Sequence, residues 1–105
     1  MHYLVRTLAN TGCSNLTEWN ASAVISEMTQ IYNDYTGNKV EMLTGASSNN
    51  STMRVTFTFN TAEELTAFAS YFRTSRDRRE AHGITLVDAI DFSEDALYNT
   101  WLSSY

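Results

Sequence analysis

The sequence predicts an α+β domain of the ferredoxin-like type, in which the elements follow the order βαββαβ and one helix is added at the C-terminus. Four short segments have the composition of strands, and three longer segments have apolar residues at helical spacing. Two right-handed crossovers would then place both long helices on one face of a four-stranded antiparallel sheet.

The first third of the chain predicts a strand over residues 2–8 and a helix over residues 17–35. Both faces of the strand carry apolar residues, so the alternation of apolar and polar residues along it is weak. The helix has apolar residues at helical spacing, namely Val24, Met28, Ile31 and Tyr35. Gly37 follows at a place where a left-handed residue commonly ends a helix.

The middle of the chain predicts a hairpin followed by the second long helix. Strands over residues 40–44 and 53–59 flank the segment 45–51, which is rich in Ser and Asn and is expected to form a flexible loop. Thr61 and Glu64 have the spacing of a capping box, in which the hydroxyl and the carboxylate accept from the first free amides of the helix.

The last part of the chain predicts a strand over residues 84–90, after a helix stop at Gly83, and a final helix. The final helix has an apolar stripe made of Leu97, Tyr98, Trp101 and Tyr105. Such a stripe is too apolar to lie in water as one ridge. It either packs on its own sheet, covering Leu4 and Leu43, or docks on a second copy or another protein.

The alternation also predicts a core and a free sheet face. The predicted core consists of Tyr3, Val5, Val55, Phe57 and Phe59 from the sheet and Val24, Met28, Ile31, Leu65, Phe68 and Phe72 from the helices. The free face is expected to present Leu4, Arg6, Leu43 and Arg54, with His2, Glu41, Thr56 and Thr58. RNA-recognition domains place aromatic rings on this face, and Leu4 and the threonines stand where such rings are needed.

Length and composition exclude several classes of protein. The 105 residues and 11.9 kDa suit a single domain over residues 1–105. A net charge of −5 argues against binding to nucleic acid or an anionic membrane. One cysteine excludes an internal disulfide. No apolar run is long enough to cross a membrane, and the first residues lack the layout of a signal peptide, which predicts a cytoplasmic protein.

Arginines gather near the end of the second long helix, and these are Arg73, Arg76, Arg78 and Arg79. They could form an anion site or a docking patch for an acidic partner. Alternatively, they complement the negative C-terminal end of the helix dipole, and Asp77 and Glu80 dilute the patch.

No catalytic constellation, metal site or cofactor motif is found in the sequence. His2, His82 and Cys13 lack a metal-ligand spacing. Cys13 lies in a loop without a basic residue close behind it, so it is expected to have no chemistry. Asp88 interrupts an apolar strand and is expected to face solvent or pair with an arginine.

We therefore expect a non-enzymatic domain that binds another protein, or a second copy of itself, through the free sheet face, the C-terminal helix or the arginine cluster. Regulators and inhibitors encoded by phages and mobile elements are often compact acidic domains of this kind. The alternative is a dimeric α+β barrel, an enzyme or ligand binder that closes two free sheet faces over a cavity. Only His2 or Glu41 could serve there as a base.

Overall fold

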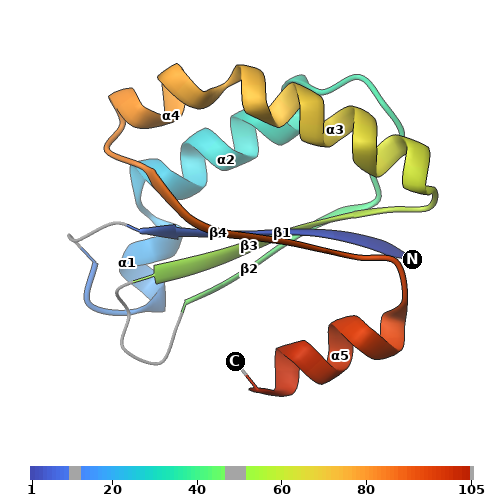
Figure 1. Cartoon of the computed structure of the whole chain (residues 1–105). Helices are drawn as coiled ribbons and strands as arrows, with labels where there is room; N and C mark the ends of the chain where they lie inside the picture. Colours follow the sequence, from blue (N-terminus) through green and yellow to red (C-terminus); the bar gives the residue numbers. More distant parts are fainter. Residues whose placement is uncertain (10–12, 47–51, 105) are drawn as a thin grey trace.

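The computed structural model describes residues 1–9, 13–46 and 52–104. In chain order its elements are β1 (His2–Ala9), α1 (Leu16–Asn20), α2 (Ala23–Asp34), β2 (Glu41–Ala46), β3 (Thr52–Phe59), α3 (Ala62–Thr74), α4 (Arg76–Ala81), β4 (Thr85–Phe92) and α5 (Asp95–Ser104) (Figure 1). Residues 47–51 of the expected hairpin loop lie outside the described residues, and its first two residues belong to β2.

The four strands form one antiparallel sheet in the order β2-β3-β1-β4. Helices α2, α3 and α4 lie over one face of this sheet, and α5 lies over the other (Figure 1). The predicted α+β class and the four-stranded antiparallel sheet are therefore confirmed. No described helix is long and apolar enough to cross a membrane.

The helix expected over residues 17–35 is divided into α1 and α2. Asn15 begins α1, since its side chain accepts from the Glu18 N–H at 3.0 Å. Ser22 interrupts the helix because its hydroxyl donates to the Trp19 carbonyl at 2.6 Å, and α2 starts at the next residue. Short polar side chains compete with the helical backbone in this way, and the apolar spacing alone does not reveal it.

Only one of the two hydrogen bonds of the predicted capping box at α3 is confirmed, the one to the Thr61 hydroxyl. The Thr61 side chain accepts from the Glu64 N–H at 3.2 Å. The Glu64 carboxylate does not complete the capping box and instead accepts from the Tyr35 hydroxyl at 3.0 Å and the Asn38 N–H at 3.1 Å. Glu64 thus ties the start of α3 to the segment after α2.

The two glycines expected to end helices differ. Gly83 has a φ of 74°, so the predicted left-handed stop after α4 is confirmed. Gly37 was assigned the same role, and this is wrong, because α2 ends at Asp34 and Gly83 is the one described glycine with positive φ. A Cβ at Gly37 would collide with the Tyr35 ring and hydroxyl, so that ring packs directly against the glycine.

The core between the helices and the sheet contains most of the predicted residues. All of the predicted helix residues and the three from β3 belong to it, with Leu65 partly buried. Leu4, Leu8, Trp19, Met53 and Ile84 complete it.

The predicted facing of β1 is wrong. Leu4 pairs with Phe57 and Arg6 pairs with Val55, so Leu4 and Arg6 lie on the helix-covered face and not on the free face. Tyr3 and Val5 lie on the opposite face, under α5. The apolar pattern could not distinguish the two faces, since both are covered and Leu4 and Val5 are 0% and 1% exposed.

Candidate anion-binding site

A cavity of about 570 Å³ opens where the end of α3, α4 and the start of β4 meet. It is lined by Arg73, Arg76, Arg79, Glu80, Gly83, Ile84, Thr85 and Leu86. A smaller hollow of about 270 Å³ shares Arg73, Arg79 and Leu86 with it and extends along β4. We call the two together the arginine groove.

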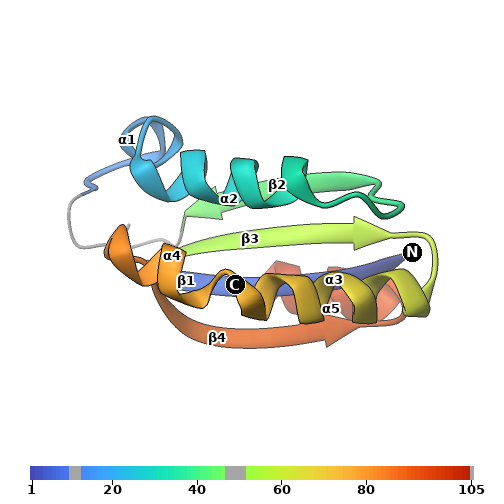
Figure 2. The same cartoon turned by 90° about the horizontal axis from the view of Figure 1, so that it is seen from above.

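The groove exists because β4 is the outermost strand on its side of the sheet. In Figure 2, α3 and α4 run above β1, and β4 curves along their outer side. The left-handed Gly83 turns the chain from α4 into this strand, and the Ile84 N–H donates to the Arg79 carbonyl at 3.1 Å. Most side chains of β4 therefore stay exposed beside the helices.

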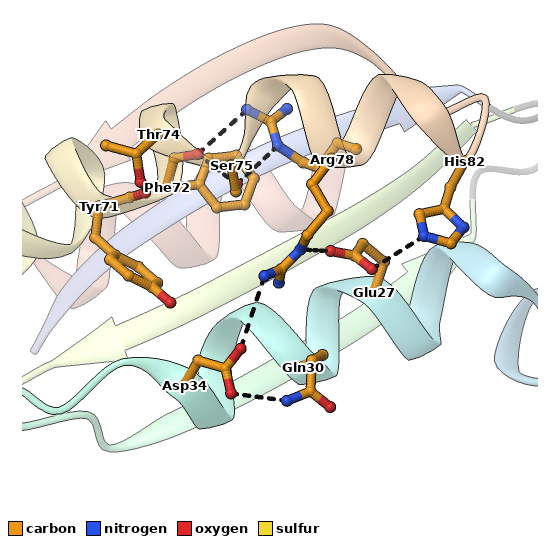
Figure 3. A network of polar contacts seen from close by, with 10 residues as sticks. Glu27, Gln30, Asp34, Tyr71, Phe72, Thr74, Ser75, Arg78 and His82 are labelled. Atoms are coloured by element: carbon orange, nitrogen blue, oxygen red, sulfur yellow. Dashed lines mark hydrogen bonds and ion pairs between the residues drawn. The ribbon is translucent and has the colours of Figure 1, made fainter.

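An ionic network fastens α4 to α2 (Figure 3). Arg78 donates a hydrogen bond to Glu27 and forms an ion pair with Asp34 at 3.7 Å. His82 Nε2 lies 3.3 Å from the same Glu27 carboxylate. Arg78 is therefore occupied by acids of α2, and the arginine cluster divides into one structural residue and three that line the groove.

Arg79 is the deepest of these three, at 5% exposed. Its Nε donates to the Ser75 hydroxyl at 3.2 Å and its Nη2 to the Phe72 carbonyl at 3.3 Å. The guanidinium carbon lies 4.2 Å from the centre of the Phe72 ring. These contacts hold the side chain in one orientation at the wall of the cavity.

No described carboxylate forms an ion pair with Arg79. Burial lowers the pKa of Arg79, nearby Glu80 opposes this, and the positive charges of Arg6 and Arg76 lower it further. A guanidinium nevertheless stays protonated in proteins. The groove thus holds a buried cation that lacks the counter-ion such a group normally has.

The other two arginines are exposed. Arg76 is paired with Glu80 at 3.0 Å, and both side chains are largely in solvent. The hydrogen bond to Glu80 raises the pKa of Arg76. The Arg73 guanidinium makes neither a hydrogen bond nor an ion pair with any residue that the structure describes. The main cavity is therefore lined by three arginines and one glutamate.

Arg6 closes the far end of the groove. Its Nη1 donates to the Asp91 carboxylate at 2.8 Å and to the Val5 carbonyl at 2.9 Å. The pair is neutral overall, so the excess positive charge stays at the α4 end. Sequence reasoning did not assign Arg6 here because it placed this side chain on the wrong face of β1.

Neither a family model, nor a curated protein, nor a solved structure matches this chain. Among the described residues, no three His, Cys, Asp or Glu residues are grouped as a metal ion requires.

The C-terminal stripe packs largely on its own sheet. Tyr98 is 5% exposed and stacks on Tyr3, and Trp101 lies 5.6 Å from the Phe92 ring and 5.7 Å from the Arg54 guanidinium. Leu97 remains 54% exposed. Tyr105 lies outside the described residues.

The two residues expected beneath α5, Leu43 and Leu4, lie on opposite faces of the sheet. Leu43 borders a small hollow with Arg54, Tyr98 and Leu102, as expected of the face under α5. Leu4 was expected there too and instead lies in the core on the other side. Cys13 is a free thiol partly buried against that core.

The two contacts of Arg79 had no signal in the sequence. Phe72 was assigned to the core, and nothing marked Ser75 as a contact of Arg79. Ser75 turns the chain between α3 and α4, because its hydroxyl donates to the Phe72 carbonyl at 2.6 Å. That bend points Arg79 back over the end of α3, and only the folded backbone reveals it.

Proposed function

We propose that this protein is a non-enzymatic interaction domain that binds an anionic segment of a partner protein in the arginine groove. The observation that carries the proposal is Arg79, which is 5% exposed, oriented by Ser75 and Phe72, and without a carboxylate partner among the described residues. A buried cation is costly, and an anionic ligand in the adjoining cavity would offset that cost.

The electrostatics of the chain support an acidic partner over a nucleic acid. The net charge is −5, so the groove is a local positive site on an acidic protein. A polyanion as long as a nucleic acid would meet repulsion from the rest of the surface. A short acidic segment would meet only the groove.

The fold and the composition support other parts of the proposal. The antiparallel sheet, with β1 and β3 at its centre and α2 and α3 on one face, supports a ferredoxin-like classification. A role as a regulator or inhibitor would follow if binding covered an acidic surface of the partner. A cytoplasmic location is compatible with a single free cysteine.

The dimeric barrel is less well supported by the geometry. It requires two sheets to meet through free faces, and α5 lies over that face here (Figure 1). Tyr98 of α5 is 5% exposed, so exposing the sheet would cost a substantial part of the folding free energy.

The test is a binding titration with a fluorescein-labelled peptide pool that contains fixed acidic residues, monitored by fluorescence anisotropy. Arg73→Gln combined with Arg76→Gln removes two exposed charges from the groove and should weaken binding by about tenfold or more. The control is Asn33→Asp combined with Thr36→Glu, which changes the net charge equally at exposed positions outside the groove. Equal binding by both variants, or no binding by the unmodified protein, would remove the proposal.

A further inference from the structure

We infer that the anion taken by the arginine groove is a phosphorylated serine or threonine of the partner. This inference rests on the proposed function, because it names the group bound at that same site. The positive lining of the main cavity, the free donors and the apolar surface beside the groove carry it.

Positive residues predominate in the lining of the main cavity. Three arginines and one glutamate line this cavity of about 570 Å³, a formal excess of two positive charges. A phosphomonoester carries a charge of about −1.5 to −2 at neutral pH on a single group. Carboxylates in an extended peptide alternate in direction and are spaced by about 3.3 Å per residue, so they cannot concentrate charge to the same degree.

The donors also suit a phosphate. Arg79 uses Nε and one hydrogen of Nη2 within the protein, and its Nη1 donates to no described residue. The Arg73 guanidinium has all its N–H groups available among the described residues, and Thr85 also lines the cavity. Guanidinium groups present paired N–H donors that match phosphate oxygens. Because Arg79 is already held in place, ordering it on binding costs little.

Glu80 does not block this use of the groove. It forms an ion pair with Arg76 in which both side chains are more than half exposed. Exposed pairs of this kind contribute little free energy. A dianion can therefore displace the Glu80 carboxylate from Arg76 while Arg79 stays in position.

Apolar surface beside the groove favours a phosphopeptide over free phosphate. Leu86 lines both parts of the groove and is 43% exposed. It belongs to the outermost strand β4. Side chains that flank a phosphorylated residue can bury Leu86, whereas inorganic phosphate cannot.

The experiment compares three peptide pools that are identical except for one fixed central residue, which is phosphoserine, glutamate or serine. The other positions are degenerate among uncharged residues, and binding to the full chain is measured by fluorescence anisotropy. We expect the phosphoserine pool to bind about tenfold or more tightly than the glutamate pool, with little binding of serine. Inorganic phosphate should compete only weakly.

Variants tie this preference to the groove. Arg73→Gln combined with Arg76→Gln should remove most of the difference between phosphoserine and glutamate, and Asn33→Asp combined with Thr36→Glu should retain it. Leu86→Ser should weaken the binding of the phosphoserine pool without changing competition by inorganic phosphate. Circular dichroism of each variant confirms that it is folded.

The possible results separate the two proposals. Equal binding of the phosphoserine and glutamate pools would overturn the inference and leave the acidic-partner function standing. Competition by inorganic phosphate as strong as that of the peptide would overturn the peptide partner and identify a site for the free anion. Absence of binding by every anionic pool would overturn both.

Discussion

The rings of Tyr3 and Tyr98 stack with their centroids 3.9 Å apart and their planes inclined by 16°. This contact joins the first strand of the chain to its last helix. The Tyr3 hydroxyl also donates to the Asp95 carboxylate at 2.8 Å, at the start of α5. The stack and the hydrogen bond hold α5 over the face of the sheet that the helix layer leaves open.

Replacing Tyr98 by alanine should destabilise the protein by about 3 kcal/mol, because it removes a large side chain that is 5% exposed. The free energy of unfolding is measured by urea denaturation. Leu97→Ala, at a position on the same helix that is 54% exposed, is the matched control and should change stability by less than about 0.5 kcal/mol. Similar losses in both variants would contradict the packing of α5 described here.

The contact between Tyr3 and Asp95 should make stability fall at alkaline pH. Burial and the hydrogen bond to Asp95 raise the pKa of Tyr3 from 10.0 to about 12. The folded protein therefore holds this proton more tightly than the unfolded chain. The stabilising contribution is complete below pH 10.0 and is lost as the pH rises toward about 12.

Tyr3→Phe should reduce this alkaline loss, as measured by the urea midpoint on both sides of that pH range. Tyr71→Phe is the control, because the Tyr71 hydroxyl forms no hydrogen bond with a described residue. The hydrogen bond from Tyr3 also lowers the pKa of Asp95, so Tyr3→Phe should remove a second contribution, one that is lost at acid pH. An unchanged alkaline profile in Tyr3→Phe would show that the contact does not form.

Replacing Arg79 by methionine should raise stability while it abolishes anion binding. Methionine is apolar and unbranched, and it removes a buried charge that has no carboxylate partner among the described residues. Substitutions of buried ionic groups by apolar ones are often neutral or stabilising, and we expect a gain of about 1 kcal/mol. Thermal unfolding measures the gain, and the anisotropy titration measures binding.

The matched variant is Arg78→Met, which removes the ion pairs to Glu27 and Asp34 and should lower stability. If Arg79→Met destabilises the protein as much as Arg78→Met, then Arg79 serves the structure through Ser75 and Phe72. The proposed binding site would then lose its main support.

Replacing Asp88 by alanine should increase self-association. The Asp88 side chain accepts from the Ala89 N–H at 2.9 Å on the outermost strand β4. A charge at this place occupies a backbone donor and discourages pairing with another strand. The molar mass measured by light scattering over a concentration series should rise in Asp88→Ala and stay constant in Glu63→Ala. A constant mass in both would show that Asp88 does not protect the edge.

Secondary structure was the most predictable part of this protein. The alternation of β3 places Val55, Phe57 and Phe59 on one face with polar residues between them, so its facing followed from hydrophobicity alone. The cap at Thr61 and the stop at Gly83 are local features with local causes. The break at Ser22 is also local, but the apolar spacing runs through it and concealed it.

The candidate site was predictable only as a cluster of arginines. The sequence shows four basic residues within seven positions, but it does not show in which direction each side chain points. Arg78 turns to acids of α2, whereas Arg79 turns to Ser75 and Phe72. The difference depends on the bend at Ser75 and on the position of α2, which are properties of the folded chain.

The sequence by itself determined the order of the elements, the facing of β3 and the presence of a basic cluster, because each depends on residues close together in the chain. Only the tertiary structure decided the facing of β1 and the burial of Arg79. The strand has apolar side chains on both faces, so its orientation depends on α5, which comes some ninety residues later in the chain. Arg79 is buried because the bend at Ser75 folds it against Phe72, and a long-range arrangement of helices and sheet excludes water from it.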